Sequence, residues 1–400
     1  MTRWAGTQRI GRIPAIVTFA VLFASPGGGA QEAAVSNWFR YDSGVATGWD
    51  VSMDRSDPMR LSIHRTIPQG STATRRVLVL YPRASSAYDI AITKILQVFE
   101  AKDLSVDFTV IDFDLDDDSA KQALDFAQHN DIDLIFAMGS ESVAWLYNHY
   151  RGGTIPVVSV CSKDPVQLGQ TPDYEKGSGS NFAFTSLNMP VEVQMAYIKE
   201  LKPDLKNLAV LVDGKNVSAV QTQAAPIAAY AGRRGTHVIW GMVQDPNRAR
   251  TELAQIVSGA VETMRKSDPE LVKSLFWVTG STSVFGEIQT INKYADRVPV
   301  IGAVPEIVTA GTDTAVLAIG ISFESNANLA AIYGAEILTG AARAGDLKVG
   351  IVTPPDIAIS FLKAREIGMR VPLEFFESAS VIYDYDGRPV RKIENKKSVE

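Results

Sequence analysis

The sequence has few of the features that mark a disulfide-stabilised, nucleic-acid-binding or membrane-embedded protein. Among its 400 residues there is one cysteine, Cys161, so no intramolecular disulfide can form. Only four histidines occur, and 39 basic residues face 45 acidic ones, which gives a formal net charge of −6. An acidic chain is a poor partner for nucleic acid or for an anionic membrane. We therefore expect a soluble globular protein that binds no nucleic acid.

Long apolar runs are also scarce, and the only one lies at the N-terminus. Three arginines and no acidic residue occur within residues 1–30, the apolar run "IPAIVTFAVLFA" covers residues 13–24, and "SPGGGA" follows. This order is typical of a cleavable signal peptide, and a run of 12 residues is too short for a helix that spans a bilayer. We predict that residues 1–30 are removed after Ala30 and that the mature chain, of net charge −9, resides in the periplasm.

The motifs of common enzymes are absent as well. The sequence contains no G-x-S-x-G, no P-loop, no H-E-x-x-H and no G-x-G-x-x-G after a predicted strand. The acidic run at residues 112–118 fails as a calcium loop, because Asp117 and Ala123 stand where glycine and glutamate are needed. Cys161 follows the buried-strand pattern "IPVVSV", which indicates a core position rather than a nucleophile. We expect no catalytic residues, no metal and no cofactor.

What the sequence does contain is a regular alternation of strand and helix patterns. From Arg75, the apolar runs "RVLVLY", "SVDFTVIDF", "IDLIFAM" and "IPVVSV" alternate with helical patterns at a spacing of about 30 residues. The alternation restarts near Ser186 with "LKNLAVLVDG", "THVIWGMV", "SLFWVTG" and "VPVIGAV". Such runs imply right-handed βαβ units whose strands are covered on both faces. The predicted fold class is α/β, with two consecutive doubly wound parallel-sheet units.

Local signals refine this pattern. Ser119 is the expected N-cap of a helix over residues 119–130, and Pro226 should kink or delay a helix over residues 217–235. Residues 31–74 are polar and irregular, so we interpret them as an N-terminal extension without an assigned role. Residues 386–400 have the composition of a solvated polar tail.

A polar cluster follows most of the predicted strands. Ligands of open parallel sheets bind outside the carboxyl ends of the strands. Each cluster alone is explained by helix capping, but six clusters, three from each unit, predict a cleft between the units. The side chains of these clusters that we expect at the ligand are Tyr81, Ser140, Ser142, Ser162, Lys163, Asp164, Asp213, Asn216, Ser218, Ser281, Thr282 and Glu306.

The cluster at residues 139–142 has the features of an anion site. A helix N-terminus offers unpaired N–H groups and a partial positive charge. Gly139 permits close approach to the backbone, and Ser140 and Ser142 add neutral hydroxyl donors. We expect a carboxylate or another small anion here.

Several longer stretches resemble one known family. They are "DIDLIFAMGSESVAWL", "IPVVSVCSKDPVQLG", "MPVEVQMAYIKELKPDLKNLAVLVDG", "VPVIGAVPEIVTAG" and "AISFLKAREIGMRVP". Over about residues 75–385 the chain resembles the substrate-binding proteins of ABC importers with the type I periplasmic-binding-protein fold, and in particular the tryptophan- and tyrosine-binding group. The resemblance implies two lobes joined by three crossovers near residues 185, 321 and 353, with the ligand between the lobes. Lobe one would comprise residues 75–185 and 322–352, and lobe two residues 186–321 and 353–385.

The sequence departs from the family pattern at positions that bear on the ligand. The family's Thr-Asp-Asn-Thr loop is Thr279, Gly280, Ser281 and Thr282 here, and of its Asp-Glu-Gly only Glu306 remains, shifted by one position. Acids that could hold an α-ammonium group are therefore depleted. We expect a ligand that is a carboxylate or polar and neutral, with Tyr81 and Phe184 as candidate apolar walls.

Three functions are compatible with these observations. The first is a monomeric binding protein that delivers a small molecule to an ABC permease. The second is the same fold presenting a ligand to a membrane sensor kinase, and the third is a secreted α/β enzyme. The sequence favours the first and does not name the ligand.

Overall fold

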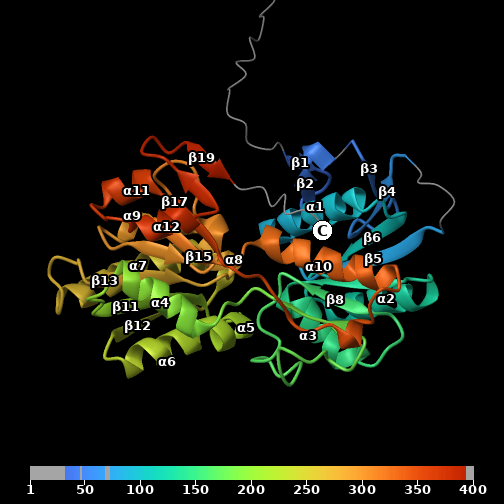
Figure 1. The fold of residues 1–400 in the computed structure, drawn as a ribbon, viewed down its shortest axis with the longest axis horizontal. Coiled ribbons are helices and arrows are strands. Elements are labelled where there is room, and N and C mark those ends of the chain that lie inside the picture. The colour runs from blue at the N-terminus through green and yellow to red at the C-terminus, as the bar shows by residue number, and fades with distance from the viewer. Residues whose placement is uncertain (1–31, 46, 68–72, 393–400) are drawn as a thin grey trace, which may run out of the picture.

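A computed structural model describes residues 32–45, 47–67 and 73–392 of the chain. The predicted signal peptide lies outside these residues. Two lobes lie side by side, each built on one large sheet (Figure 1). The prediction of an α/β fold with two parallel-dominated sheets is confirmed.

Lobe one is built on a seven-stranded sheet whose central strands are parallel. In spatial order its strands are β3 (Trp49–Met53), β4 (Arg60–Arg65), β6 (Val106–Asp112), β5 (Arg75–Tyr81), β7 (Leu134–Met138), β8 (Val157–Val160) and β9 (Phe182–Ala183). Its helices are α1 (Ser86–Ala101), α2 (Asp117–His129), α3 (Gly139–Tyr150) and α10 (Phe323–Leu338).

Alternation along β5 explains why helices cover both faces of this sheet. Val77 and Val79 pack with α1 and α10, whereas Leu78 and Leu80 pack with α2 and α3. Successive side chains of a strand point to opposite faces, so a strand buried on both sides must be apolar throughout.

Lobe two is built on an eight-stranded sheet. In spatial order its strands are β12 (His237–Val243), β11 (Asn207–Asp213), β13 (Ser274–Val278), β14 (Val300–Gly302), β15 (Leu317–Gly320), β17 (Asp356–Ser360), β18 (Val381–Tyr383) and β19 (Pro389–Lys392). Its helices are α4 (Val191–Leu201), α5 (Val217–Ala219), α6 (Ala225–Arg233), α7 (Ala249–Arg265), α8 (Thr282–Phe285), α9 (Ile288–Tyr294), α11 (Phe361–Glu366) and α12 (Leu373–Ser378). Short helical turns occur in both lobes. Lobe one contains η1 (Ser43–Val45) and η5 (Ala344–Asp346), and lobe two contains the π-helical η2 (Val220–Ala224), η3 (Pro246–Arg248) and η4 (Pro305–Ile307).

The chain passes between the lobes at three places. It leaves β9 through β10 (Thr185–Ser186) for α4, returns from β15 to α10, and leaves β16 (Gly350–Ile351) for β17. Strands β10 and β16 pair with each other in parallel, so two of the connections are bonded side by side. Such paired crossovers form the connection about which two lobes can rotate.

The N-terminal extension is part of lobe one. Strands β1 (Glu32–Ala34) and β2 (Arg40–Asp42) pair with each other, while β3 and β4 extend the large sheet beyond β6. Trp49 on β3 is 1% exposed and packs edge-on against Phe108 at 5.5 Å between ring centroids. Burial of such large aromatic surfaces anchors this segment firmly.

Local predictions had mixed outcomes. The N-cap of α2 is Asp116, not Ser119, because the Asp116 carboxylate accepts the Ser119 N–H at 2.8 Å. The helix predicted over residues 217–235 is divided into α5, the π-turn η2 and α6. Helix α6 begins at Ala225 with Pro226 in its first turn, in agreement with the later start that we allowed for. Residues 389–392 of the expected tail form β19, which pairs with β18.

Candidate functional site

The carboxyl ends of the central strands of the two lobes face each other. Several hydrogen bonds cross the boundary between the lobes, and three of them join residues far in sequence from the crossovers. Lys163 Nζ donates to Gly280 O at 3.3 Å, Gln221 Nε2 donates to Gln167 O at 2.6 Å, and the hydroxyls of Ser85 and Thr282 lie 3.3 Å apart. The lobes are therefore closed on each other in this structure.

The loops of lobe one meet around Ser140. Its hydroxyl oxygen accepts the Lys163 N–H at 3.0 Å and lies 3.4 Å from the hydroxyl of Ser162. Ser142 is fully buried and donates to Leu80 O at 3.1 Å, so its hydroxyl is used inside the lobe. Of the two serines expected to bind an anion, Ser140 alone borders the cleft.

Gly139 has a positive φ of 72°, and Tyr88 fills the space beside it. A Cβ added at this glycine would lie 2.0 Å from the Tyr88 hydroxyl. The close approach that we predicted for a ligand is thus made by a side chain of the same lobe. Tyr88 is not among the predicted site residues, because in the sequence it is only one of the regularly spaced apolar residues of α1.

Asp164 organises its own loop. Its carboxylate accepts the Tyr174 hydroxyl at 2.6 Å and the N–H groups of Val166 and Gln167 at 2.9 and 3.0 Å. The residue is 4% exposed. All of these partners belong to the segment that follows β8, so the Asp164 carboxylate is occupied within lobe one.

Asp213 and Asn216 play comparable parts in lobe two. Asp213 accepts the Ser283 hydroxyl at 2.7 Å and the Lys215 N–H at 2.9 Å. Asn216 accepts the Ala219 N–H at 3.0 Å and the Ser218 hydroxyl at 2.8 Å, which caps α5. Their oxygens hold the turn after β11 in shape.

Two more predicted residues follow β13. Ser281 is fully buried and its hydroxyl oxygen accepts the Thr279 hydroxyl at 3.1 Å. Thr282, at the start of α8, faces Ser85 of lobe one. Gly280 lies just before Ser281, and its backbone carbonyl accepts the hydrogen bond from Lys163 at the boundary. Its N–H donates to Gln223 Oε1 at 3.0 Å.

Glu306 joins the lobes close to the second crossover. Its Oε1 accepts the N–H of Phe323, the first residue of α10, at 2.7 Å, while its Oε2 is covered and accepts no hydrogen bond. Burial raises the pKa of this carboxyl to about 8, against partial compensation by backbone N–H groups. Glu306 is therefore a helix-capping group that resists ionisation near neutral pH.

Tyr81 and Phe184 lie in the core and form no wall of the cleft. Tyr81 is fully buried among Trp38, Phe39 and Tyr88, and donates its hydroxyl to Tyr88 O at 3.1 Å. Phe184 stacks on Phe182 at 5.5 Å. Tyr81 and Phe184 are aromatic residues at or near strand ends, as residues lining a cleft can also be. Their sequence context therefore did not show that they lie in the core.

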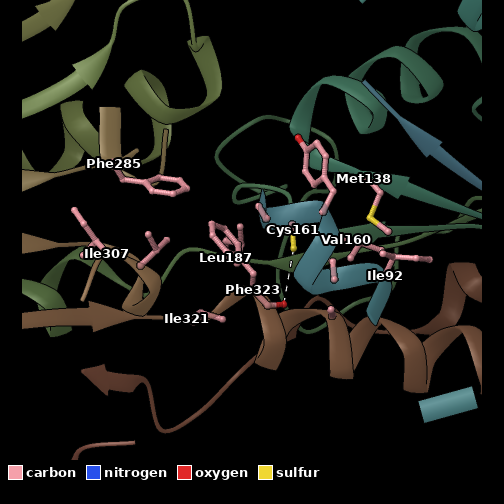
Figure 2. Packing of buried hydrophobic residues seen from close by; sticks show 14 of the residues in the cluster. Ile92, Met138, Val160, Cys161, Leu187, Phe285, Ile307, Ile321 and Phe323 are labelled. Carbon is pink, nitrogen blue, oxygen red and sulfur yellow. Dashed lines mark hydrogen bonds between the residues drawn. The ribbon is translucent and has the colours of Figure 1, made fainter. Parts of the chain in front are cut away.

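An apolar cluster underlies the closed boundary. Figure 2 shows Cys161 of lobe one facing Leu187, Phe285 and Ile307, with Phe323 at the start of α10 between them. Cys161 is 6% exposed, and burial raises the pKa of its thiol well above the ordinary range. The core interpretation of Cys161 is confirmed.

An open groove of about 370 Å³ lies between α3 and the turn after β11. Lobe one lines it with Ser140, Glu141, Ala144, Tyr147, Asn148, Leu168 and Gln170, and lobe two with Lys215, Asn216, Val217 and Ser218. This volume suits a small organic molecule. Gln170 is 7% exposed and its Oε1 accepts no hydrogen bond, so a buried amide beside the groove retains bonding capacity. Gln170 is absent from the predicted site because it lies beyond the strand-end clusters.

The predicted residues thus fall into three groups. Those at the groove or the boundary between the lobes are Ser140, Lys163, Asn216, Ser218, Thr282 and Glu306. Those that support the turns behind them are Ser142, Ser162, Asp164, Asp213 and Ser281. Those in the core are Tyr81 and Phe184.

The described residues contain neither a metal-binding cluster nor a membrane-spanning helix. No cluster of three or more His, Cys, Asp or Glu side chains there could hold a metal ion. No helix within residues 32–392, gaps excepted, is long and apolar enough to cross a membrane.

Comparison with protein families gives a direct result. Residues 92–381 match the family described as ABC transporter substrate binding protein. The chain belongs to this family of substrate-binding proteins. No curated protein matches the chain significantly.

Solved structures show the same fold. A conserved domain protein from Vibrio cholerae is 20% identical, with a TM-score of 0.63 over 78% of this chain and 100% of its own. An ABC domain from Streptococcus pneumonia in complex with L-Trp is 17% identical, with a TM-score of 0.61 over 78% and 100%. The ligand-free, open substrate-binding protein CD0873 from Clostridium difficile is 21% identical, with a TM-score of 0.57 over 77% and 98%.

Proposed function

We propose that this substrate-binding protein is exported, captures a small organic ligand between its lobes and delivers it to an ABC permease. The ligand is a carboxylate or a polar neutral molecule without a free α-ammonium group, and the protein acts as a monomer and has no catalytic activity. One observation supports this most strongly: the groove between α3 and residues 215–218 is lined by both lobes. A ligand that contacts both lobes selects the closed form, because those contacts exist only there.

The acids near the groove support the preference against an ammonium group. Asp164 and Asp213 are bonded to groups of their own lobes. Glu141 pairs with Arg83 at 2.7 Å. Burial keeps the pKa of Glu306 at about 8. A buried ammonium needs a paired carboxylate, since an unpaired buried charge is costly.

Calorimetry with matched compounds tests the ligand class. We expect phenylpyruvate, 4-hydroxyphenylpyruvate or indole-3-pyruvate to bind at least about tenfold more tightly than phenylalanine, tyrosine or tryptophan, a difference of about 1.4 kcal/mol. Tighter binding of the amino acids would contradict the proposed ligand class. N-terminal sequencing of the mature protein tests export, with Gln31 as the expected first residue.

A further inference from the structure

Lys163 is a buried amine without an ion-pair partner among the described residues. The residue is 4% exposed, and the acceptor of its Nζ is the neutral carbonyl of Gly280 at 3.3 Å. Among the described residues, no carboxylate lies within ion-pair distance of Nζ. The Glu141 carboxylate, which pairs with Arg83 at 2.7 Å, acts on the ammonium only from farther away. Two other lysines with well-covered side chains differ: Lys363 pairs with Glu366 at 3.3 Å and Lys94 with Glu324 at 2.7 Å.

A buried ammonium that faces one carbonyl is incompletely satisfied. An ammonium group has three N–H donors, and here one has an acceptor within the described protein. Burial lowers the pKa of Lys163 to about 8, so the group remains mostly protonated at pH 7. An anion placed beside it would restore both the missing charge and the missing acceptors.

The position of this ammonium ties it to closure of the lobes. Lys163 belongs to lobe one, and its backbone N–H is held by Ser140, which also lines the groove. Its Nζ lies against lobe two at a glycine, where an added Cβ would come within 2.7 Å of it. The absence of a side chain at Gly280 is therefore what admits the ammonium to the boundary between the lobes.

We propose that Lys163 is the counter-charge for an anionic group of the ligand, and that the protein therefore selects organic acids over amino acids and over neutral analogues. This inference rests on the proposed function and narrows its ligand class. The Lys163 ammonium lies at the boundary where the α-ammonium group of an amino acid would also have to bind. Repulsion between these two positive charges disfavours binding of a zwitterion. Ser140, which holds the Lys163 backbone, also lines the groove that would take the rest of the ligand. The two charged side chains of that groove are Glu141, which pairs with Arg83, and the exposed Lys215.

The test compares small molecules retained by wild type and by lysine variants purified from the same periplasmic extract. Mass spectrometry identifies the retained compounds. Shifts in melting temperature measure the binding of phenylacetate, indole-3-acetate and 4-methylpentanoate, and of the carboxamide of each acid. We expect wild type to retain a carboxylic acid and to prefer each acid to its amide. Lys163→Met should retain at least tenfold less, and Lys163→Arg an intermediate amount. Lys363→Met removes a covered lysine on α11 and should retain as much as wild type.

Each outcome has a distinct meaning. Equal retention of one compound by wild type and Lys163→Met would overturn the role of Lys163. Retention of a neutral or cationic compound would do the same. Both results would leave the proposed capture of a small ligand intact. If wild type neither retains a compound nor shifts with any probe or with the extract, both the proposed function and this inference fail. Should Lys163→Met not fold, Lys163→Gln keeps a donor for the Gly280 carbonyl and must show the same loss.

Discussion

At the scale of single residues, the boundary between the lobes is unusual because it buries a lysine and a glutamate, and burial favours the neutral form of each. Burial lowers the pKa of Lys163 to about 8 and raises that of Glu306 to about 8. No ion pair joins them in the described structure. Each group bonds to a backbone partner of the opposite lobe, Lys163 to the Gly280 carbonyl and Glu306 to the Phe323 N–H.

Glu306 predicts a measurable dependence of stability on pH. Below its ordinary pKa of 4.5 the carboxyl is protonated in both folded and unfolded chains and has no effect. Between 4.5 and about 8 the unfolded chain ionises while the folded chain stays protonated. The free energy of unfolding should therefore fall as pH rises through this window, by up to about 1.4 kcal/mol per unit.

Replacement of Glu306 by Gln removes this titration and keeps an acceptor for the Phe323 N–H. We expect urea unfolding of Glu306→Gln at pH 5, 6.5 and 8 to show a flatter decline than wild type. Glu262→Gln, at an exposed position on α7, serves as the control and should follow wild type. Parallel declines in wild type and Glu306→Gln would show that the carboxyl ionises freely in the folded protein.

At the scale of elements, the N-terminal segment behaves as part of the lobe-one sheet. Strand β4 pairs antiparallel with β6, and β3 pairs with β4 at the sheet edge. Trp49 is buried against Phe108, and the Arg65 guanidinium lies over its ring at 5.0 Å. The polar composition of residues 31–74 concealed these strands, because only one face of β3 and β4 is buried and the apolar residues are few.

Trp49→Ala should destabilise lobe one substantially. Truncation of a fully buried tryptophan costs about 3–5 kcal/mol through lost burial and the cavity that remains. The matched control is Trp240→Ala on the edge strand β12, where the side chain is 45% exposed and we expect a change of about 0.5 kcal/mol. Urea unfolding measures both. Equal effects would mean that the N-terminal strands contribute little to the stability of the lobe.

At the scale of the whole molecule, we expect ligand capture to involve rotation of the lobes about the paired crossovers. Strands β10 and β16 hold two of these crossovers together, and the hydrogen bonds between the lobes lie at the strand ends on either side of the cleft. We expect opening to break these bonds and to expose the groove. A ligand that contacts both sides shifts the population toward the closed form.

A cross-link between Ser85 and Thr282 tests this motion. Their hydroxyls lie 3.3 Å apart in the closed form, and both side chains reach the boundary. In Ser85→Cys/Thr282→Cys we expect a disulfide on oxidation, forming faster when ligand is bound. Small-angle scattering should then show the cross-linked protein to be as compact as the ligand-bound wild type. Native Cys161 is buried and should not interfere, and each single-cysteine variant provides the control. A cross-linking rate unaffected by a saturating ligand would argue against ligand-driven closure.

The sequence alone determined the α/β class, the restart of the pattern near Ser186 and the strand ends that meet between the lobes. It could do so because periodicity, strand apolarity and turn chemistry are local properties. Membership of the substrate-binding family followed from the same stretches and is now shown.

Only the tertiary structure decided what the polar residues at those strand ends do. Asp164, Asp213 and Ser142 have the same sequence context as Lys163 and Ser140, yet they bond to partners within their own lobes. Tyr81 and Phe184 turned inward for the same reason that Trp49 did, since burial of aromatic surface outweighs their position at strand ends. Whether a polar group is free to meet a ligand depends on partners distant in sequence, such as Gly280 for Lys163, and a local pattern carries no information about them.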